Sequence, residues 1–162
     1  MGIFDIITPA FFCPPQNNEK RLAVLKKNIK FVELEISTFC NRRCFFCGNK
    51  DIDRRSANRY MDEDLYLSIL QQLQEFQYTG KLAFHRYNEP LADPIIFTRL
   101  RQARTFLPEA LLCIFTNGDY LDRDMFLHLE ELGVREMEIS APYFDEGEVY
   151  SPEEARNRIE GR

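Results

Sequence analysis

The chain has 162 residues, of which 44% are hydrophobic and 29% are charged, and its formal net charge is −5. A chain of this length forms one domain and can bury roughly two thirds of its unfolded surface. No apolar run in it reaches the roughly 18 to 20 residues that cross a bilayer. The negative charge argues against a nucleic-acid binder, and no basic segment of a secretory signal opens the chain. We therefore expect a cytoplasmic protein with neither a membrane nor a nucleic acid as its partner.

Residues 1–30 are predicted to form an N-terminal extension that precedes the main domain at residues 31–162. After a capping residue at Asn17 or Asn18, apolar side chains recur at helical spacing at Leu22, Leu25 and Ile29. Most of the lysines and arginines in this stretch lie elsewhere around the helix. This pattern predicts an amphipathic helix whose basic face lies in solvent.

Four later segments have the apolar pattern and the strand-forming residues of β-strands: 31–38, 81–85, 111–116 and 136–140. Helical patterns separate these segments, so strands and helices alternate along the chain. This order specifies an α/β fold in which helices cover a parallel sheet. Functional side chains of such sheets gather where the strands end.

Each predicted helix between the strands has a capping residue and one apolar face. The first begins after Asp62, ends at Gly80 and carries on one face Leu65, Ile69, Leu73 and Phe76. The second has Asp93 as its N-cap and Pro94 as its first residue, and its core-facing residues are Ile96, Leu100 and Ala103. The third begins after Asp122, ends at Gly133 and directs inward Met125, Leu129 and Leu132.

The last segment of the chain has the pattern of another helix start. Residues 151–154 read Ser-Pro-Glu-Glu, and only eight residues follow them. A parallel sheet that ended with its fourth strand would also leave an unpaired edge. We therefore expect a fragment, or a chain that another polypeptide completes.

Cysteine usage indicates a metal site. The chain has five cysteines, an odd number, which does not suit a framework of disulfides. Cys40, Cys44 and Cys47 fall within eight residues of one another. Thiolates that converge from one short loop are typical ligands of a metal centre. The other two cysteines, Cys13 and Cys113, are expected to be dispensable for this centre, and Cys113 is expected to pack inside a strand.

The cysteine segment reads Cys-Asn-Arg-Arg-Cys-Phe-Phe-Cys, and it resembles the CxxxCxxC signature of the radical S-adenosylmethionine (SAM) superfamily. The resemblance implies a partial (β/α) barrel, of which this chain would be the N-terminal portion. It also implies that Cys40, Cys44 and Cys47 bind a 4Fe-4S cluster whose fourth iron is left for SAM. In the family, reductive cleavage of SAM yields a 5'-deoxyadenosyl radical that abstracts a hydrogen atom from the substrate.

A second resemblance lies after the second predicted strand. The segment Tyr87-Asn88-Glu89-Pro90 is similar to the family's GGEP motif, with Tyr87 and Asn88 in place of the two glycines. By resemblance, Asn88, Glu89 and Pro90 contact the amino group of SAM. Thr116-Asn117-Gly118 similarly resembles a TNG segment that the family often carries after its third strand.

The resemblance implies two further cofactor contacts. Phe46 is expected near the adenine, and Ser140, at the end of the fourth strand, near the methionyl carboxylate or the ribose. No residue is assigned as catalytic. The neighbouring Arg42 and Arg43 are expected to be solvated.

The main alternative is a non-catalytic module that binds iron–sulfur or zinc through the same cysteines. Zinc sites usually have four ligands in two pairs, and the remaining cysteines and histidines lack that spacing. On the enzyme reading, the expected partners are a substrate, either a small molecule or a peptide, and an electron donor such as a flavodoxin or a ferredoxin. The sequence does not identify the substrate.

Overall fold

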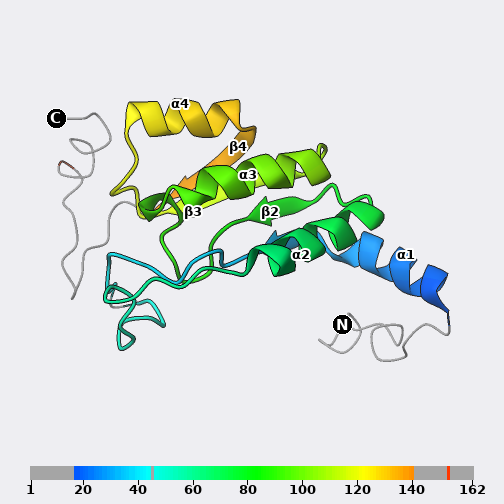
Figure 1. The fold of residues 1–162 in the computed structure, drawn as a ribbon, viewed down its shortest axis with the longest axis horizontal. Helices are drawn as coiled ribbons and strands as arrows, with labels where there is room; N and C mark the ends of the chain where they lie inside the picture. Colours follow the sequence, from blue (N-terminus) through cyan, green and yellow to red (C-terminus); the bar gives the residue numbers. More distant parts are fainter. Residues whose placement is uncertain (1–16, 45, 141–152, 154–162) are drawn as a thin grey trace.

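The computed structural model describes residues 17–44, 46–140 and Glu153. Of the predicted helix start at 151–154, only Glu153 belongs to the described residues. The elements in chain order are α1 (Asn18–Asn28), β1 (Phe31–Glu33), α2 (Glu63–Glu75), β2 (Lys81–Ala83), the 3-10 helix η3 (Pro90–Ala92), α3 (Ile95–Phe106), β3 (Leu111–Thr116), α4 (Arg123–Glu131) and β4 (Val134–Ile139). Figure 1 shows their arrangement, and none of the described helices is long and apolar enough to cross a membrane.

The four strands form one parallel sheet in the order β1-β2-β3-β4. Phe31 of β1 pairs with Lys81 of β2, which in turn pairs with Leu111 of β3. On the other side of β3, Thr116 pairs with Ile139 of β4. This confirms the predicted α/β fold of about four parallel strands with covering helices. Because the strands are parallel, all of them end at one edge of the sheet, which we call the carboxyl edge.

The first strand is shorter than predicted. Pairing with β2 covers only Phe31–Glu33 rather than 31–38. The chain then turns toward the segment that returns to α2: Ser37 forms an isolated antiparallel bridge with Tyr60, and the N–H of Met61 donates to the carbonyl of Ile36 at 3.0 Å. The alternation of apolar and polar residues continues through this stretch because one side of it still faces the core.

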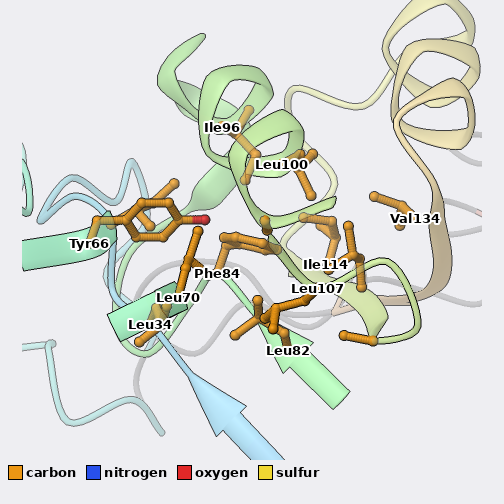
Figure 2. Packing of buried hydrophobic residues seen from close by; sticks show 14 of the residues in the cluster. Leu34, Tyr66, Leu70, Leu82, Phe84, Ile96, Leu100, Leu107, Ile114 and Val134 are labelled. Atoms are coloured by element: carbon orange, nitrogen blue, oxygen red, sulfur yellow. The ribbon is translucent and has the colours of Figure 1, made fainter. Parts of the chain in front are cut away.

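The hydrophobic core lies between the sheet and its covering helices. Figure 2 shows side chains from β2, β3 and the strand-end residue Phe84 packed against α2 and α3; those with no exposed surface include Leu70, Leu82, Phe84, Ile96, Leu100 and Ile114. The core-facing residues predicted for α3 are confirmed, since Ile96, Leu100 and Ala103 are all fully buried. Alternate residues supply this core from β3, Leu112 and Ile114, and from the end of β2, Leu82 and Phe84, as a two-residue side-chain period requires.

Helix α2 presents a different face to the core from the one predicted. Its buried residues are Tyr66, Leu70 and Leu73, whereas Leu65 is 53% exposed. The predicted and observed faces share Leu73 and are otherwise shifted by one position. The difference arises because Tyr66, which the predicted face does not include, lies inside and donates its hydroxyl to the carbonyl of Arg99 at 2.7 Å.

Gly80 does not end α2, because the helix stops at Glu75 and a turn with positive φ at Gln77 follows. Its importance lies in close packing. A Cβ atom at Gly80 would lie 2.6 Å from the carbonyl oxygen of Lys30 and 2.5 Å from the hydroxyl of Tyr78. The start of β2 therefore passes against the end of the α1–β1 connection without room for a side chain.

The predicted capping residues are largely confirmed. The side chains of Asn17, Asp62 and Asp122 each accept a hydrogen bond from a backbone N–H in the first turn of their helices. Helix α3 begins one residue later than predicted, with Pro94 in the capping position and Asp93 accepting from the N–H of Ile95 at 3.0 Å. Strand β4 begins two residues earlier than predicted and ends at Ile139, so that Ser140 follows the strand.

Candidate functional site

The three clustered cysteines lie in the segment between β1 and α2, which we call the cysteine loop (residues 38–59). In Figure 1 this loop, in cyan, lies at the end of the sheet toward which the arrows of β2 and β4 point. Its two ends are tied together, since the N–H of Thr38 donates to the carbonyl of Arg59 at 2.9 Å and the side chain of Asn58 accepts from two backbone N–H groups. Cys40, Cys44 and Cys47 are free thiols of intermediate exposure.

The thiol chemistry favours a cationic centre at this loop. The pKa of Cys40 is raised to about 11, chiefly by burial; a backbone hydrogen bond from Arg42 opposes the rise, and negative charge on Glu89, Cys44 and Cys47 adds to it. A bound metal supplies the positive charge that stabilises thiolates. These groups also lie close enough to Cys40 to act on one another electrostatically.

The donor set of the loop consists of three thiols. Within residues 17–44 and 46–140, no three His, Cys, Asp or Glu side chains are grouped so that they could hold one metal ion. In a 4Fe-4S cubane each thiolate binds a different iron. Three thiols on one loop are the kind and number of ligands that three irons of such a cluster require.

After β2, residues 88–91 are buried against the cysteine loop. The backbone N–H of Glu89 donates to the carbonyl of Phe39 at 2.8 Å, one residue before Cys40. Asn88 is 7% exposed and donates its amide to the hydroxyl of Ser37 and to the carbonyl of Phe84, both at 3.3 Å. Pro90 is also buried and begins η3. The predicted residues Asn88, Glu89 and Pro90 thus lie together at the carboxyl edge.

The carboxylate of Glu89 joins the ends of β2 and β3. It is 2% exposed and accepts three hydrogen bonds, from the N–H of Leu91 at 3.0 Å, the hydroxyl of Thr116 at 2.6 Å and the N–H of Asn117 at 2.7 Å. Burial raises its pKa, while these three hydrogen bonds oppose the rise. Glu89 therefore has a structural role in addition to the cofactor contact that the sequence predicts.

A buried ion pair connects the cysteine loop to the end of β3. Arg42 is 8% exposed, so the prediction that it is solvated is wrong. Its Nε and Nη2 atoms each donate to a different carboxylate oxygen of Asp119 at 2.7 Å. The partner is 77 residues away along the chain. Nothing in the local sequence around Arg42 indicates this pairing, which the sequence interpretation missed.

Two asparagines extend this connection. Asn41 donates to Asp119 at 2.8 Å and accepts from the side-chain amide of Asn117 at 2.8 Å. Asn117 in turn accepts from the backbone N–H of Asp119 at 2.9 Å, across the positive-φ residue Gly118. The Thr-Asn-Gly segment identified in the sequence is therefore more than a turn, because its asparagine contacts the cysteine loop.

The two remaining predicted contacts, Phe46 and Ser140, are both exposed. The backbone N–H of Ser140 donates to the carbonyl of Thr116 at 2.8 Å, and its own carbonyl lies 3.5 Å from Nη1 of Arg42. Ser140 thus belongs to the same edge as Glu89 and Asp119. Phe46 is 57% exposed on the cysteine loop.

Tyr87, which replaces the first glycine of the family motif, packs on the other side of the cysteine loop. Its ring lies next to Gly48, since a Cβ atom there would be 3.6 Å from Cε1 of Tyr87. The guanidinium groups of Arg54 and Arg86 lie 5.5 and 5.4 Å from the ring centroid. Asn49 donates to the carbonyl of Tyr87 at 2.7 Å. The loop is thereby held from the β2 side as well as from the β3 side.

Comparison with known proteins agrees with this arrangement. Residues 34–160 match the family model of the radical SAM superfamily. The chain is 32% identical over 111 residues to an S-adenosyl-L-methionine-dependent 2-deoxy-scyllo-inosamine dehydrogenase from Niallia circulans, which covers 68% of this chain and 44% of the relative. It is 32% identical over 106 residues to a tungsten-containing aldehyde ferredoxin oxidoreductase cofactor-modifying protein from Pyrococcus furiosus, covering 65% of this chain and 29% of that relative.

Two solved structures have a similar fold. The crystal structure of BtrN in complex with AdoMet and 2-DOIA aligns with a TM-score of 0.62 and 30% identity, covering 68% of this chain and 44% of that one. BtrN in an open conformation gives a TM-score of 0.61 and 30% identity, covering 68% and 49%. This chain belongs to the radical SAM superfamily. It spans less than half the length of the relatives that it matches.

Proposed function

We propose that this chain binds a 4Fe-4S cluster through Cys40, Cys44 and Cys47 and binds SAM at the adjoining carboxyl edge. The observation that supports this most strongly is the contact between the two motifs: the backbone of Glu89 is hydrogen-bonded to Phe39, at the start of the cysteine loop. Members of the superfamily need the cluster and SAM to be adjacent. When bound, the cluster supplies the electron that cleaves SAM into a hydrogen-abstracting 5'-deoxyadenosyl radical.

On this proposal the residues at the edge have distinct tasks. Asn88, Glu89 and Pro90 present backbone groups and one carboxylate toward the amino group of SAM. Ser140, at the end of β4, serves the methionyl carboxylate or the ribose, and Phe46 lies along the adenine. The hydrogen bonds that hold Glu89 to Thr116 and Asn117 fix the direction of its carboxylate before SAM arrives.

The reaction that we propose is hydrogen abstraction from a small molecule. The relative from Niallia circulans is named as a dehydrogenase of 2-deoxy-scyllo-inosamine, and the solved BtrN complex contains 2-DOIA as well as AdoMet. A cytoplasmic flavodoxin or ferredoxin would supply the electron, in a compartment that keeps the three thiols reduced. That the substrate of the whole protein is a small molecule is therefore part of this proposal.

Anaerobic reconstitution with iron and sulfide tests the proposed function. We expect about four irons per chain, an electron paramagnetic resonance (EPR) signal of the reduced cluster that changes when SAM is added, and 5'-deoxyadenosine when a chemical reductant is present. The matched pair of variants is Cys44→Ala, which should lose all three signals, and Cys113→Ala, which should keep them. Iron binding without any response to SAM would instead favour the non-catalytic module and would overturn the proposal.

A further inference from the structure

We infer that Arg42 and Asp119 are positioning residues, which hold the cysteine loop against the end of β3 in the orientation that SAM binding needs. This inference rests on the proposed function of the site. Arg42 lies between two of the proposed cluster ligands, Cys40 and Cys44. Asp119 lies two residues after Asn117, whose N–H is bonded to Glu89. The ion pair therefore joins the proposed cluster ligands to the proposed SAM-binding segment.

The geometry of the pair is that of an orienting contact. The planar guanidinium binds both carboxylate oxygens of Asp119 at 2.7 Å, which fixes the direction as well as the distance between the two loops. Asn41 adds a third hydrogen bond to the same carboxylate. The side chains of Arg42 and Asp119 are 7% and 16% exposed, so solvent screens their interaction only weakly.

Stability alone is a poor explanation for a pair of this kind. Moving two charges out of water is costly, and apolar residues of similar volume often stabilise a fold as well or better. A buried ion pair is better explained as a contact that favours one relative orientation of the two segments that it joins. Here the two segments are loops at strand ends, and without the pair fewer contacts would fix their relative orientation, while the sheet beneath them stayed intact.

Two variants separate positioning from stability. Asp119→Asn keeps the shape of the side chain and leaves the Arg42 charge buried without its counter-ion, so we expect a less stable protein that also binds SAM about tenfold more weakly. The double variant Arg42→Met/Asp119→Leu removes both charges together, which should restore the unfolding midpoint. It should not restore SAM affinity, because an apolar contact does not set the direction of the loop.

The matched control is the ion pair Lys81–Glu136, which joins the first residue of β2 to the middle of β4 and is 45% and 40% exposed. The double variant Lys81→Gln/Glu136→Gln should leave both SAM affinity and iron content unchanged. A merely structural role for Arg42 and Asp119 predicts instead that SAM affinity recovers together with stability in the Arg42→Met/Asp119→Leu protein. That recovery would overturn the inference.

A second measurement is independent of the cluster. Hydrogen exchange is measured on the iron-free proteins. Backbone amides of the cysteine loop should exchange at least tenfold faster in the Arg42→Met/Asp119→Leu protein than in the parent chain, whereas the exchange rates of β3 amides should be unchanged. Equal exchange rates would overturn the inference even if SAM binds. If the parent chain takes up iron but never responds to SAM, the proposed function fails, while the exchange experiment still decides whether the pair holds the loop.

Discussion

The hydrophobic core and the buried polar groups at the carboxyl edge are built in opposite ways. Between the sheet and the helices, apolar side chains such as Phe84 and Leu100 have no exposed surface and contact whatever apolar neighbours the packing provides. At the carboxyl edge, Arg42 and Glu89 are buried almost as deeply, but each depends on particular partners. Apolar burial is non-directional, whereas a buried polar group without its partner is costly.

This difference separates stability from function within one small fold. Mutations in the core should change the free energy of unfolding and leave the proposed cofactor contacts alone. Mutations at the edge should change cofactor binding at a smaller cost in stability, provided that they leave no charge buried alone. The following variants test that separation, beginning with the largest expected effect.

Cys44→Ala should abolish the reconstituted cluster, because a cubane held by two thiolates is readily lost. The unfolding midpoint of the iron-free protein should change little, since Cys44 is only partly buried. Cys113→Ala is the converse control: its side chain is fully buried in β3, so it should lower the free energy of unfolding by about 1 kcal/mol and keep its iron. Iron analysis and urea unfolding on the same samples decide, and iron retained in Cys44→Ala would refute the ligand assignment.

Phe84→Ala should lower the free energy of unfolding by roughly 3 to 5 kcal/mol, as large-to-small changes of buried phenylalanines do. Phe84 is fully buried, whereas Phe115 at the end of β3 is half-buried against His85. Phe115→Ala is therefore the matched control, with an expected loss of less than half as much. Urea unfolding of the iron-free proteins measures both, and equal losses would contradict the assignment of the core to the helix-covered face.

Glu89→Gln should keep its iron and bind SAM about tenfold more weakly, which corresponds to about 1.4 kcal/mol. Glutamine preserves the shape of the side chain, but its amide nitrogen cannot accept from the N–H of Asn117 as the carboxylate oxygen does. Alanine is less suitable, because it would leave three donors without an acceptor. Glu138→Gln, an exposed change on β4, is the control. Equal SAM affinity in the two variants would remove Glu89 from the site.

The smallest expected effect is a dependence of stability on pH that comes from His85. Burial lowers the pKa of His85 below its ordinary value of 6.5, although negative charges nearby, first among them Glu33 at 3.6 Å, oppose this. Arg86 acts in the same direction as burial, while Glu138 and Glu35 oppose it. Below pH 6.5 the unfolded chain then binds more protons than the folded one, so the free energy of unfolding should fall as the pH drops below this value.

Unfolding in urea between pH 5 and pH 8 measures this contribution. The slope below pH 6.5 should become shallower in His85→Gln. In Glu33→Gln it should persist, because removing the neighbouring negative charge leaves burial and Arg86 to lower the pKa of His85 still further. An unchanged slope in His85→Gln would assign the pH dependence to other groups.

The parts of this structure that the sequence predicts correctly are those that depend on neighbours a few residues away. Helix caps such as Asn17 and Asp122 act within one turn, and the buried face of α3 follows from its own periodicity. The first strand was predicted too long because the alternation of 31–38 continues beyond its last pair with β2. Alternation of apolar and polar residues indicates which side of a segment faces the core, but it does not indicate whether a neighbouring strand pairs with that segment.

The site shows the same division. Its motifs can be identified from the sequence because each is a short contiguous segment. The structure brings the segments after β1 and β2 into contact. The ion pair between Arg42 and Asp119 was missed because its two residues belong to different segments, 77 residues apart. A charge next to a polar loop suggests exposure unless the partner is known. The sequence feature that could have indicated a partner for Arg42 was Asp119, an acidic residue directly after the Thr-Asn-Gly segment.

Gly80 shows how a position far from the chemistry can resemble a functional one. A methyl group there would lie 2.6 Å from the backbone of Lys30, and a backbone atom cannot move aside as a side chain can. In a saturation mutagenesis screen scored by activity, every substitution at Gly80 should therefore be depleted as completely as substitutions at Cys44. Scoring the same library by protein abundance would separate the two, since Gly80 variants should disappear from the cell whereas Cys44 variants should accumulate as inactive protein.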